Sequence, residues 1–239
     1  MARRIRAITF DFWGTLFHDA NLELRHTLRV NALREVTGVG EETADKALRE
    51  VYRVFFRTHV DELRTLDHRD GARMCAERLE VQLAGPALEA LATRFGEAIL
   101  EHPAGLIDGA GDAVRAAASR LPIGLISDTG ISPGASLSVL LQRHDLKRHF
   151  GVLTYSDLMG VSKPRPVMFE HTAGALGVAP GEILHLGDLE PTDIVGAQGV
   201  GGQAGLFAGV NEKYYDGTRA EYRFKNWYEF LDQLEDILA

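Results

Sequence analysis

The spacing of hydrophobic positions changes along the chain. Residues 5–10 form a short apolar run that ends at Asp11, as expected for a buried strand. From about 21 to 101, apolar residues instead recur at steps of three and four, for example over 44–55 and 88–99. This spacing puts them on one face of a helix and leaves no strand signal between the helices. The stretch therefore predicts a unit of amphipathic helices.

After residue 105, short apolar runs alternate with helical patterns. The runs predict strands at 122–127, 151–154, 183–187 and 202–207. The helical patterns predict helices at 109–120, 134–143, 166–177, 191–199 and 226–238. Strands that alternate with helices form a parallel sheet, because each crossover must return over a face of the sheet. The sequence thus predicts an α/β fold, a doubly wound parallel sheet of Rossmann-like type with a helical insertion.

The net charge and the cysteine content indicate which partners and which cellular compartment to expect. The 239 residues carry a formal net charge of -8, which argues against nucleic acid or an anionic membrane, since binding to either depends on basic patches. Small molecules or proteins are the expected partners, and no pattern specifies an oligomeric state. The single cysteine, Cys75, excludes an intramolecular disulfide and fits a reducing compartment. We expect a cytoplasmic protein, because no apolar stretch is long enough to span a bilayer.

Polar residues follow three of the predicted strands. Asp11 follows the first, Ser127 and Asp128 end the second, and Asp188 follows the strand at 183–187. Ligands of parallel sheets bind at the carboxyl ends of the strands. Two carboxylates on neighbouring strands suit a hard divalent cation, with Mg²⁺ the expected one. Lys163, in a loop before a helix, adds a positive charge that can offset negative charge on a transferring group.

These residues stand in a recognisable order. The order Asp-x-x-Gly-Thr, strand-end Ser, Lys-Pro and Gly-Asp-x4-Asp resembles the four motifs of the haloacid dehalogenase superfamily. The helical insertion resembles the cap of its first subclass, and 220–224 with 227–238 resembles its last strand and helix. The resemblance implies a core domain over 1–16 and 105–239, and a helical cap domain over 17–104.

The resemblance also implies a role for each motif residue. Asp11 would be the nucleophile and form a covalent acyl intermediate. Mg²⁺ would be bound by Asp11, the backbone carbonyl of Trp13 and Asp188, and Asp193 would hold a water ligand of the metal. The transferring group of a small anionic substrate would be held by Thr15, Ser127 and the amide of Asp128. Lys163 would neutralise its charge.

Trp13 departs from the phosphatase pattern. Phosphatases of this superfamily carry an aspartate there, which protonates the leaving oxygen and later deprotonates water. An indole cannot exchange protons at neutral pH, so a rate contribution of about 10² to 10⁴ is lost unless another group replaces it. His18 and Asp19 are the nearest titratable candidates. Trp13 itself is expected either to pack against the cap or to form a platform for the substrate.

Three functions remain open on these residues. We expect a hydrolase, most simply a Mg²⁺-dependent phosphatase of small phosphorylated metabolites. The alternative is a metal-independent 2-haloacid dehalogenase, because those enzymes also carry an aromatic residue at the position of Trp13 and halide leaves without a proton. Asp188 favours the phosphatase, since dehalogenases have a polar Ser/Asn pair there, and Phe169 replaces their usual tyrosine. The third possibility, of another class, is a catalytically weak binding or scaffold protein.

Overall fold

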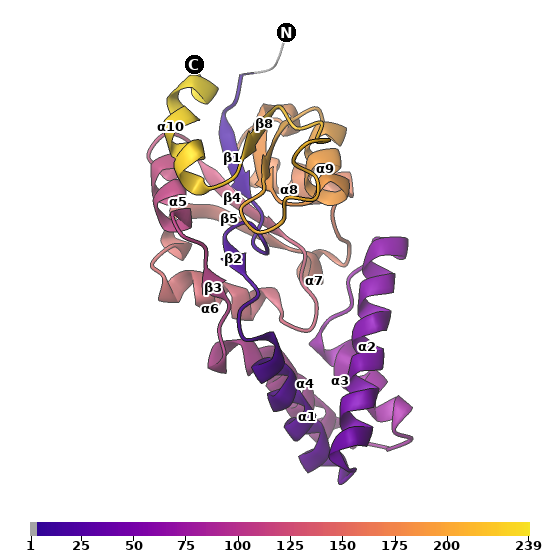
Figure 1. Cartoon of the computed structure of the whole chain (residues 1–239). Helices are drawn as coiled ribbons and strands as arrows, with labels where there is room; N and C mark the ends of the chain where they lie inside the picture. Colours follow the sequence, from indigo (N-terminus) through magenta and orange to yellow (C-terminus); the bar gives the residue numbers. More distant parts are fainter. Residues whose placement is uncertain (1–3) are drawn as a thin grey trace.

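A parallel sheet forms the centre of the molecule (Figure 1). The structure is a computed structural model that describes residues 4–239, so the first three residues of the predicted core range lie outside the described part. Six strands pair in parallel in the order β5-β4-β1-β6-β7-β8. Their bounds are β1 Ala7–Phe10, β4 Ile123–Ser127, β5 Phe150–Tyr155, β6 Ile183–Gly187, β7 Gln203–Phe207 and β8 Tyr222–Phe224.

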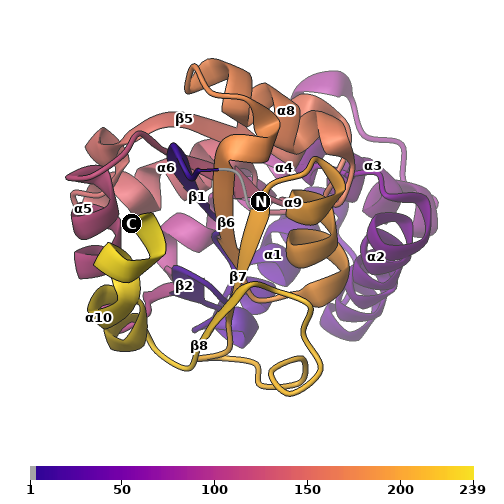
Figure 2. The ribbon, with the colours of Figure 1, turned by 90° about the horizontal axis from the view of Figure 1, so that it is seen from above.

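The central strands are apolar because helices cover both faces of the sheet. In β1, β4 and β6 every residue is buried. One face packs against α5, α6 and α10, and the other against α8 and α9 (Figure 2). These helices are α5 Ala110–Ala118, α6 Gly134–Arg143, α8 Pro166–Ala175, α9 Val195–Gly199 and α10 Trp227–Leu238. The predicted doubly wound α/β fold is therefore confirmed.

The core elements agree with the predicted ranges to within a few residues, with one local difference. A single helix was expected at 191–199, but the chain forms a π-helical turn over Glu190–Ile194 before α9. Short additional turns are α7 Ser156–Met159, Lys147–His149 and Pro180–Glu182. The wider turn follows from local bonding, because the Asp193 carboxylate accepts the Leu189 amide at 3.0 Å. It places Asp193 beside the end of β6.

The stretch predicted to be helical forms four helices, α1 Leu22–Thr37, α2 Glu41–Glu62, α3 His68–Arg78 and α4 Gly85–Glu101. Local signals set their ends: Gly38 closes α1 with φ 75°, and the Asp67 side chain accepts the first amides of α3. The helices bury an apolar cluster of their own, which includes Leu33, Leu48 and Phe95. We call residues 22–101 the helical segment. Within residues 4–239, no helix is both long and apolar enough to cross a bilayer.

Two very short strands connect the helical segment to the sheet. β2 Phe17–His18 pairs antiparallel with β3 Gly105–Leu106, with His18 opposite Gly105. Arg25 joins the same two connections, because its guanidinium donates to the backbone carbonyls of Ala20 and His102. The chain therefore leaves the sheet and returns to it at adjacent points.

The packing of α9 against α8 gives a test of the core. A Cβ at Gly196 would lie 2.3 Å from the ring of Phe169, whereas a Cβ at Gly199 would meet no described atom within 4 Å. We expect Gly196→Ala to lower the free energy of unfolding by about 1–3 kcal/mol through overpacking. Gly199→Ala in the same helix should change it by less than about 1 kcal/mol. Urea denaturation measures both, and equal losses would contradict this packing.

Candidate active site

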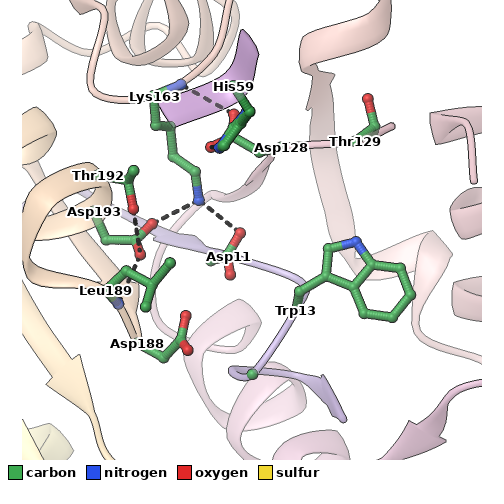
Figure 3. Close-up of a pocket in the computed structure, with 11 residues that line it drawn as sticks. Asp11, Trp13, His59, Asp128, Thr129, Lys163, Asp188, Leu189, Thr192 and Asp193 are labelled. Atoms are coloured by element: carbon green, nitrogen blue, oxygen red, sulfur yellow. Dashed lines mark hydrogen bonds and ion pairs between the residues drawn. The ribbon is translucent and has the colours of Figure 1, made fainter. Parts of the chain in front are cut away.

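A cavity of about 360 Å³ lies at the carboxyl ends of β1, β4 and β6 (Figure 3). Because β1 pairs with both neighbours, the residues after these strands meet at one edge. The cavity is lined by Asp11, Trp13, Gly14, His59, Asp128, Thr129, Lys163, Asp188, Leu189, Thr192 and Asp193. Most of the sequence-predicted site residues thus lie together.

Asp11 is held in place from both ends. Its amide donates to the Leu186 carbonyl at 2.8 Å, which continues the β1–β6 pairing by one residue. Its Oδ1 accepts a hydrogen bond from Lys163 Nζ at 2.6 Å. The Thr15 hydroxyl donates to Oδ2 at the longer distance of 3.5 Å. The carboxylate is buried at the cavity wall, where a substrate can reach it.

Lys163 is the centre of a buried charge network. Its Nζ also donates to Asp193 Oδ1 at 2.6 Å, and its amide donates to Asp128 Oδ1 at 3.0 Å. The His185 Nε2 lies 3.0 Å from Asp193 Oδ1, and its Nδ1 lies 2.9 Å from the Thr9 hydroxyl. Buried charges are stable when paired and hydrogen-bonded in this way. The network fixes Lys163 between two carboxylates.

The pKa shifts follow from burial and these contacts. Burial by itself would lower the pKa of Lys163, but the carboxylates of Asp11 and Asp193 outweigh it and raise that pKa above its usual value. Burial would raise the pKa of Asp193, but Lys163 and His185 outweigh it and hold that pKa below its usual range. Lys163 is therefore cationic and Asp193 anionic at neutral pH.

The pKa values of two other carboxyls, Asp11 and Asp188, are raised, in contrast to that of Asp193. Burial raises the pKa of Asp11 to about 7, against the opposing charge of Lys163. Burial, together with the charges of Asp11 and Asp193, raises the pKa of Asp188 to about 8. The single positive charge of Lys163 thus does not balance the negative charges of the carboxylates that line the cavity.

The acidic cluster fits a small hard cation. Asp11, Asp188 and Asp193 each offer an oxygen within 4.8 Å of the others. Asp188 is only 8% exposed, and no described side chain donates a hydrogen bond to it. The turn at Gly14, with φ +69°, packs so closely that a Cβ there would lie 2.4 Å from Asp188 Oδ2. Since Lys163, His185 and the Leu189 amide already bind Asp193, the oxygens of Asp11 and Asp188 are the available ligands.

Two predicted phosphate ligands lie outside the cavity wall. Thr15 is buried behind Asp11, and Ser127 is buried with its hydroxyl donating to the Asp128 carbonyl at 3.2 Å. Among described residues, Thr129 and Thr192 line the cavity, and the Thr129 hydroxyl donates to Asp157 Oδ1 at 2.9 Å. The predicted binding roles of Thr15, Ser127 and the Asp128 amide stay predictions.

The two suggested replacements for the missing aspartate lie elsewhere. His18 is exposed on β2, and Asp19 forms an ion pair with Arg25. The cavity instead receives His59 from α2, whose Nε2 lies 3.5 Å from Asp128 Oδ2 (Figure 3). His59 is the one imidazole among the described residues that line this cavity. No sequence motif marks it, because docking of the helical segment brings it to the site.

The sequence profile of haloacid dehalogenase-like hydrolases matches residues 5–201. The chain belongs to this family. The hydrolase shares the motif order of the family and also its α/β core. Among curated protein sequences, none matches it.

Solved structures show the same fold along nearly the whole chain. A HAD phosphatase from Thermococcus onnurineus is 21% identical, with a TM-score of 0.68, and the match covers 96% of this hydrolase and 98% of that chain. A 2-haloacid dehalogenase from Pseudomonas syringae pv. Tomato is 20% identical, with a TM-score of 0.67 and 98% of each chain covered. A HAD hydrolase from Bacillus subtilis bound to magnesium is 17% identical, with a TM-score of 0.64 and 99% of each chain covered.

The raised pKa values predict how stability depends on pH in the metal-free hydrolase. Unfolded aspartates are ionised above pH 5, whereas folded Asp11 and Asp188 keep protons up to about pH 7 and 8. Stability should therefore fall as pH rises from about 5 to 8, by up to about 1.4 kcal/mol per pH unit for each proton that the folded state keeps and the unfolded state has lost, and should level off above pH 8. Denaturant unfolding in a chelator measures this slope.

The substitution Asp188→Asn removes one of the two titrating carboxyls. It also removes the negative charge that Asp188 places beside Asp11. Its stability should depend less on pH over the same range than that of the native protein. Asp112→Asn on α5, an exposed change far from the cavity, serves as the control and should keep the native slope. If the free energy of unfolding has the same slope against pH in the native protein and in Asp188→Asn, the raised pKa of Asp188 is contradicted.

Proposed function

We propose that the chain is a Mg²⁺-dependent hydrolase of small phosphate monoesters. The observation that carries this proposal is Asp188, a buried carboxylate beside Asp11 to which no described side chain donates. A buried carboxylate that no other side chain balances with a hydrogen bond or an ion pair is costly, and a metal ion would relieve that cost. The magnesium-bound hydrolase and the phosphatase among the related folds are consistent with this reaction.

Asp11 and Asp188 would hold the metal, with the Trp13 carbonyl as the third ligand that the family resemblance implies. When bound, Mg²⁺ supplies positive charge that offsets these carboxylates and the substrate phosphate. Lys163 holds the Asp11 carboxylate in one orientation through its 2.6 Å hydrogen bond. Its ammonium also offsets negative charge that gathers on the phosphoryl oxygens.

The reaction has two displacement steps. An Asp11 oxygen bonds to phosphorus while the bond to the ester oxygen breaks, and the ester oxygen takes a proton to leave as an alcohol. A water oxygen then bonds to phosphorus, loses a proton, and the bond to Asp11 breaks. Inorganic phosphate and the free Asp11 carboxylate result.

We assign the proton transfers to His59. Its imidazole lines the cavity, and Asp128 Oδ2 lies 3.5 Å from Nε2, where it can orient the ring. His59 would give its proton to the ester oxygen in the first step and take one from water in the second. The helical segment thereby supplies the function that Trp13 cannot.

A 2-haloacid dehalogenase is the second candidate. Trp13, an aromatic residue at the position of the second aspartate, favours it, because halide is a weak base and leaves without a proton. The dehalogenase from Pseudomonas syringae also has this fold. Dehalogenation needs no metal, so it does not account for the buried Asp188 carboxylate. We therefore rank it below the phosphatase.

Substrate assays separate the two reactions. We expect Mg²⁺-dependent release of phosphate from a panel of phosphate esters, and none from Asp11→Asn, which cannot form the covalent intermediate. Asp188→Asn should lose the response to Mg²⁺ while keeping its fold. Chloride release from 2-chloropropionate without metal would move the assignment to the dehalogenase. Ligand binding without turnover of any substrate would indicate a binding protein.

The role of His59 predicts a dependence on the leaving group. Alkyl phosphates need a proton on the leaving oxygen, whereas aryl phosphates leave with little help. We expect His59→Gln to slow alkyl phosphates by about 10² and aryl phosphates much less. Steady-state kcat over a series of leaving groups measures this difference.

A second variant separates proton transfer from packing. Trp13→Asp restores the carboxylate of the phosphatase pattern, so in the His59→Gln background it should recover part of the alkyl phosphatase rate. His18→Gln, at an exposed position of strand β2, is the control and should behave like the native protein. Equal slowing of alkyl and aryl phosphates by His59→Gln would remove His59 from the proton transfers.

A further inference from the structure

A second cavity, of about 180 Å³, lies next to the catalytic one. Trp13 lines both cavities. The loop after β4 is shared as well, with Asp128 and Thr129 on the catalytic side and 130–132 on the other. Figure 3 shows the Trp13 indole extending away from Asp188 and Lys163. A molecule bound at Asp11 can therefore extend along the indole toward the second cavity.

Two buried arginines line this second cavity. Arg25 and Arg29 lie one turn apart on α1, and each is only 2% exposed. Arg25 forms an ion pair with Asp19, which lies on the same wall. Burial, with the neighbouring charge of Arg29, lowers the pKa of Arg25 to about 10. The cavity thus contains two guanidinium groups and one carboxylate.

Arg29 has only neutral partners. It donates to the Phe95 carbonyl at 2.9 Å, to the Ser132 hydroxyl at 3.0 Å and to the Tyr52 hydroxyl at 3.3 Å. No described carboxylate lies within ion-pair distance of its guanidinium. A guanidinium carries five N–H donors, so these three bonds leave two donors free.

A buried cation without a counter-ion destabilises the protein that contains it. The neutral contacts of Arg29 tie the helical segment to the core, but hydrogen bonds of that kind do not require a charge. A planar guanidinium with free donors matches a carboxylate, which it binds through two parallel hydrogen bonds. A bound carboxylate would supply the missing negative charge.

We propose that the second cavity binds a carboxylate of the substrate, so that the substrate is a phosphate monoester of a small hydroxy acid. Its phosphate lies at Asp11, its carboxylate at Arg29, and its carbon atoms pass along the indole of Trp13. This substrate class rests on the proposed function, whereas carboxylate binding at Arg29 does not. It also gives Trp13 a role in place of the missing aspartate.

Two matched esters test the substrate class. Isopropyl phosphate differs from 2-phospholactate only by a methyl group in place of the carboxylate. We expect kcat/KM to be higher for 2-phospholactate by about ten- to a hundredfold, the effect of hydrogen bonds to a charged group. Arg29→Met should lose this preference and still hydrolyse isopropyl phosphate. Arg34→Met, a change on the same helix at a half-buried position outside the second cavity, should keep it.

A binding measurement tests the site without catalysis. Trp227 is fully buried in the core, so lactate that enters the second cavity should change the fluorescence of Trp13. We expect a saturable change in the native protein and in Arg34→Met without metal, and none in Arg29→Met. Trp13→Phe identifies the source of the signal.

The outcomes separate the two proposals. Lactate binding that depends on Arg29, with no phosphate ester hydrolysed, would keep the carboxylate site and overturn the phosphatase. Hydrolysis of both esters at equal rates, with no lactate binding, would overturn the carboxylate site and keep the phosphatase. The comparison of the two esters in the native protein needs no variant, so it decides the question even if Arg29→Met does not fold.

Discussion

The active-site edge of the sheet depends on one buried ammonium group. Lys163 lies 2.6 Å from both Asp11, which follows β1, and Asp193, which lies in the turn after the adjacent strand β6. Removing one member of such a buried set leaves a charge without a partner and costs about 3–5 kcal/mol. The contacts that orient Asp11, the proposed nucleophile, are therefore also contacts that stabilise the fold. Lys163 cannot be exchanged for a neutral residue without loss of both.

The two cavities have opposite imbalances of charge. Around Asp11, the carboxylates outnumber the cations, and burial together with the charges of Asp11 and Asp193 raises the pKa of Asp188. Around Arg29, the guanidinium groups outnumber the carboxylates. Trp13 lines both cavities and adds no charge to either. For the substrate that we propose, with two anionic groups, this arrangement would fix its direction in the site.

The sheet and the strand-end motifs could be predicted because their signals are local. Strands buried on both faces read as continuous apolar runs, and the pairing of β1 with β6 confirms that Asp11 and Asp188 follow neighbouring strands. β2 and β3 are too short to show an alternating pattern. The sequence did not predict His59 or Arg29 as site residues, because the helical periodicity shows each only as a polar position. Their neighbours in space lie on other elements, which no spacing along the chain reveals.

The pairing of β2 with β3 has a consequence for how this architecture diversifies. The helical segment enters and leaves through His18 and Gly105, which face each other across two antiparallel strands. An insertion whose ends already meet leaves the sheet intact when it is lengthened, shortened or replaced. Residues of the helical segment that line the cavity, such as His59, can therefore change by exchange of this segment, while the strand ends that hold Asp11 and Asp188 stay unaltered.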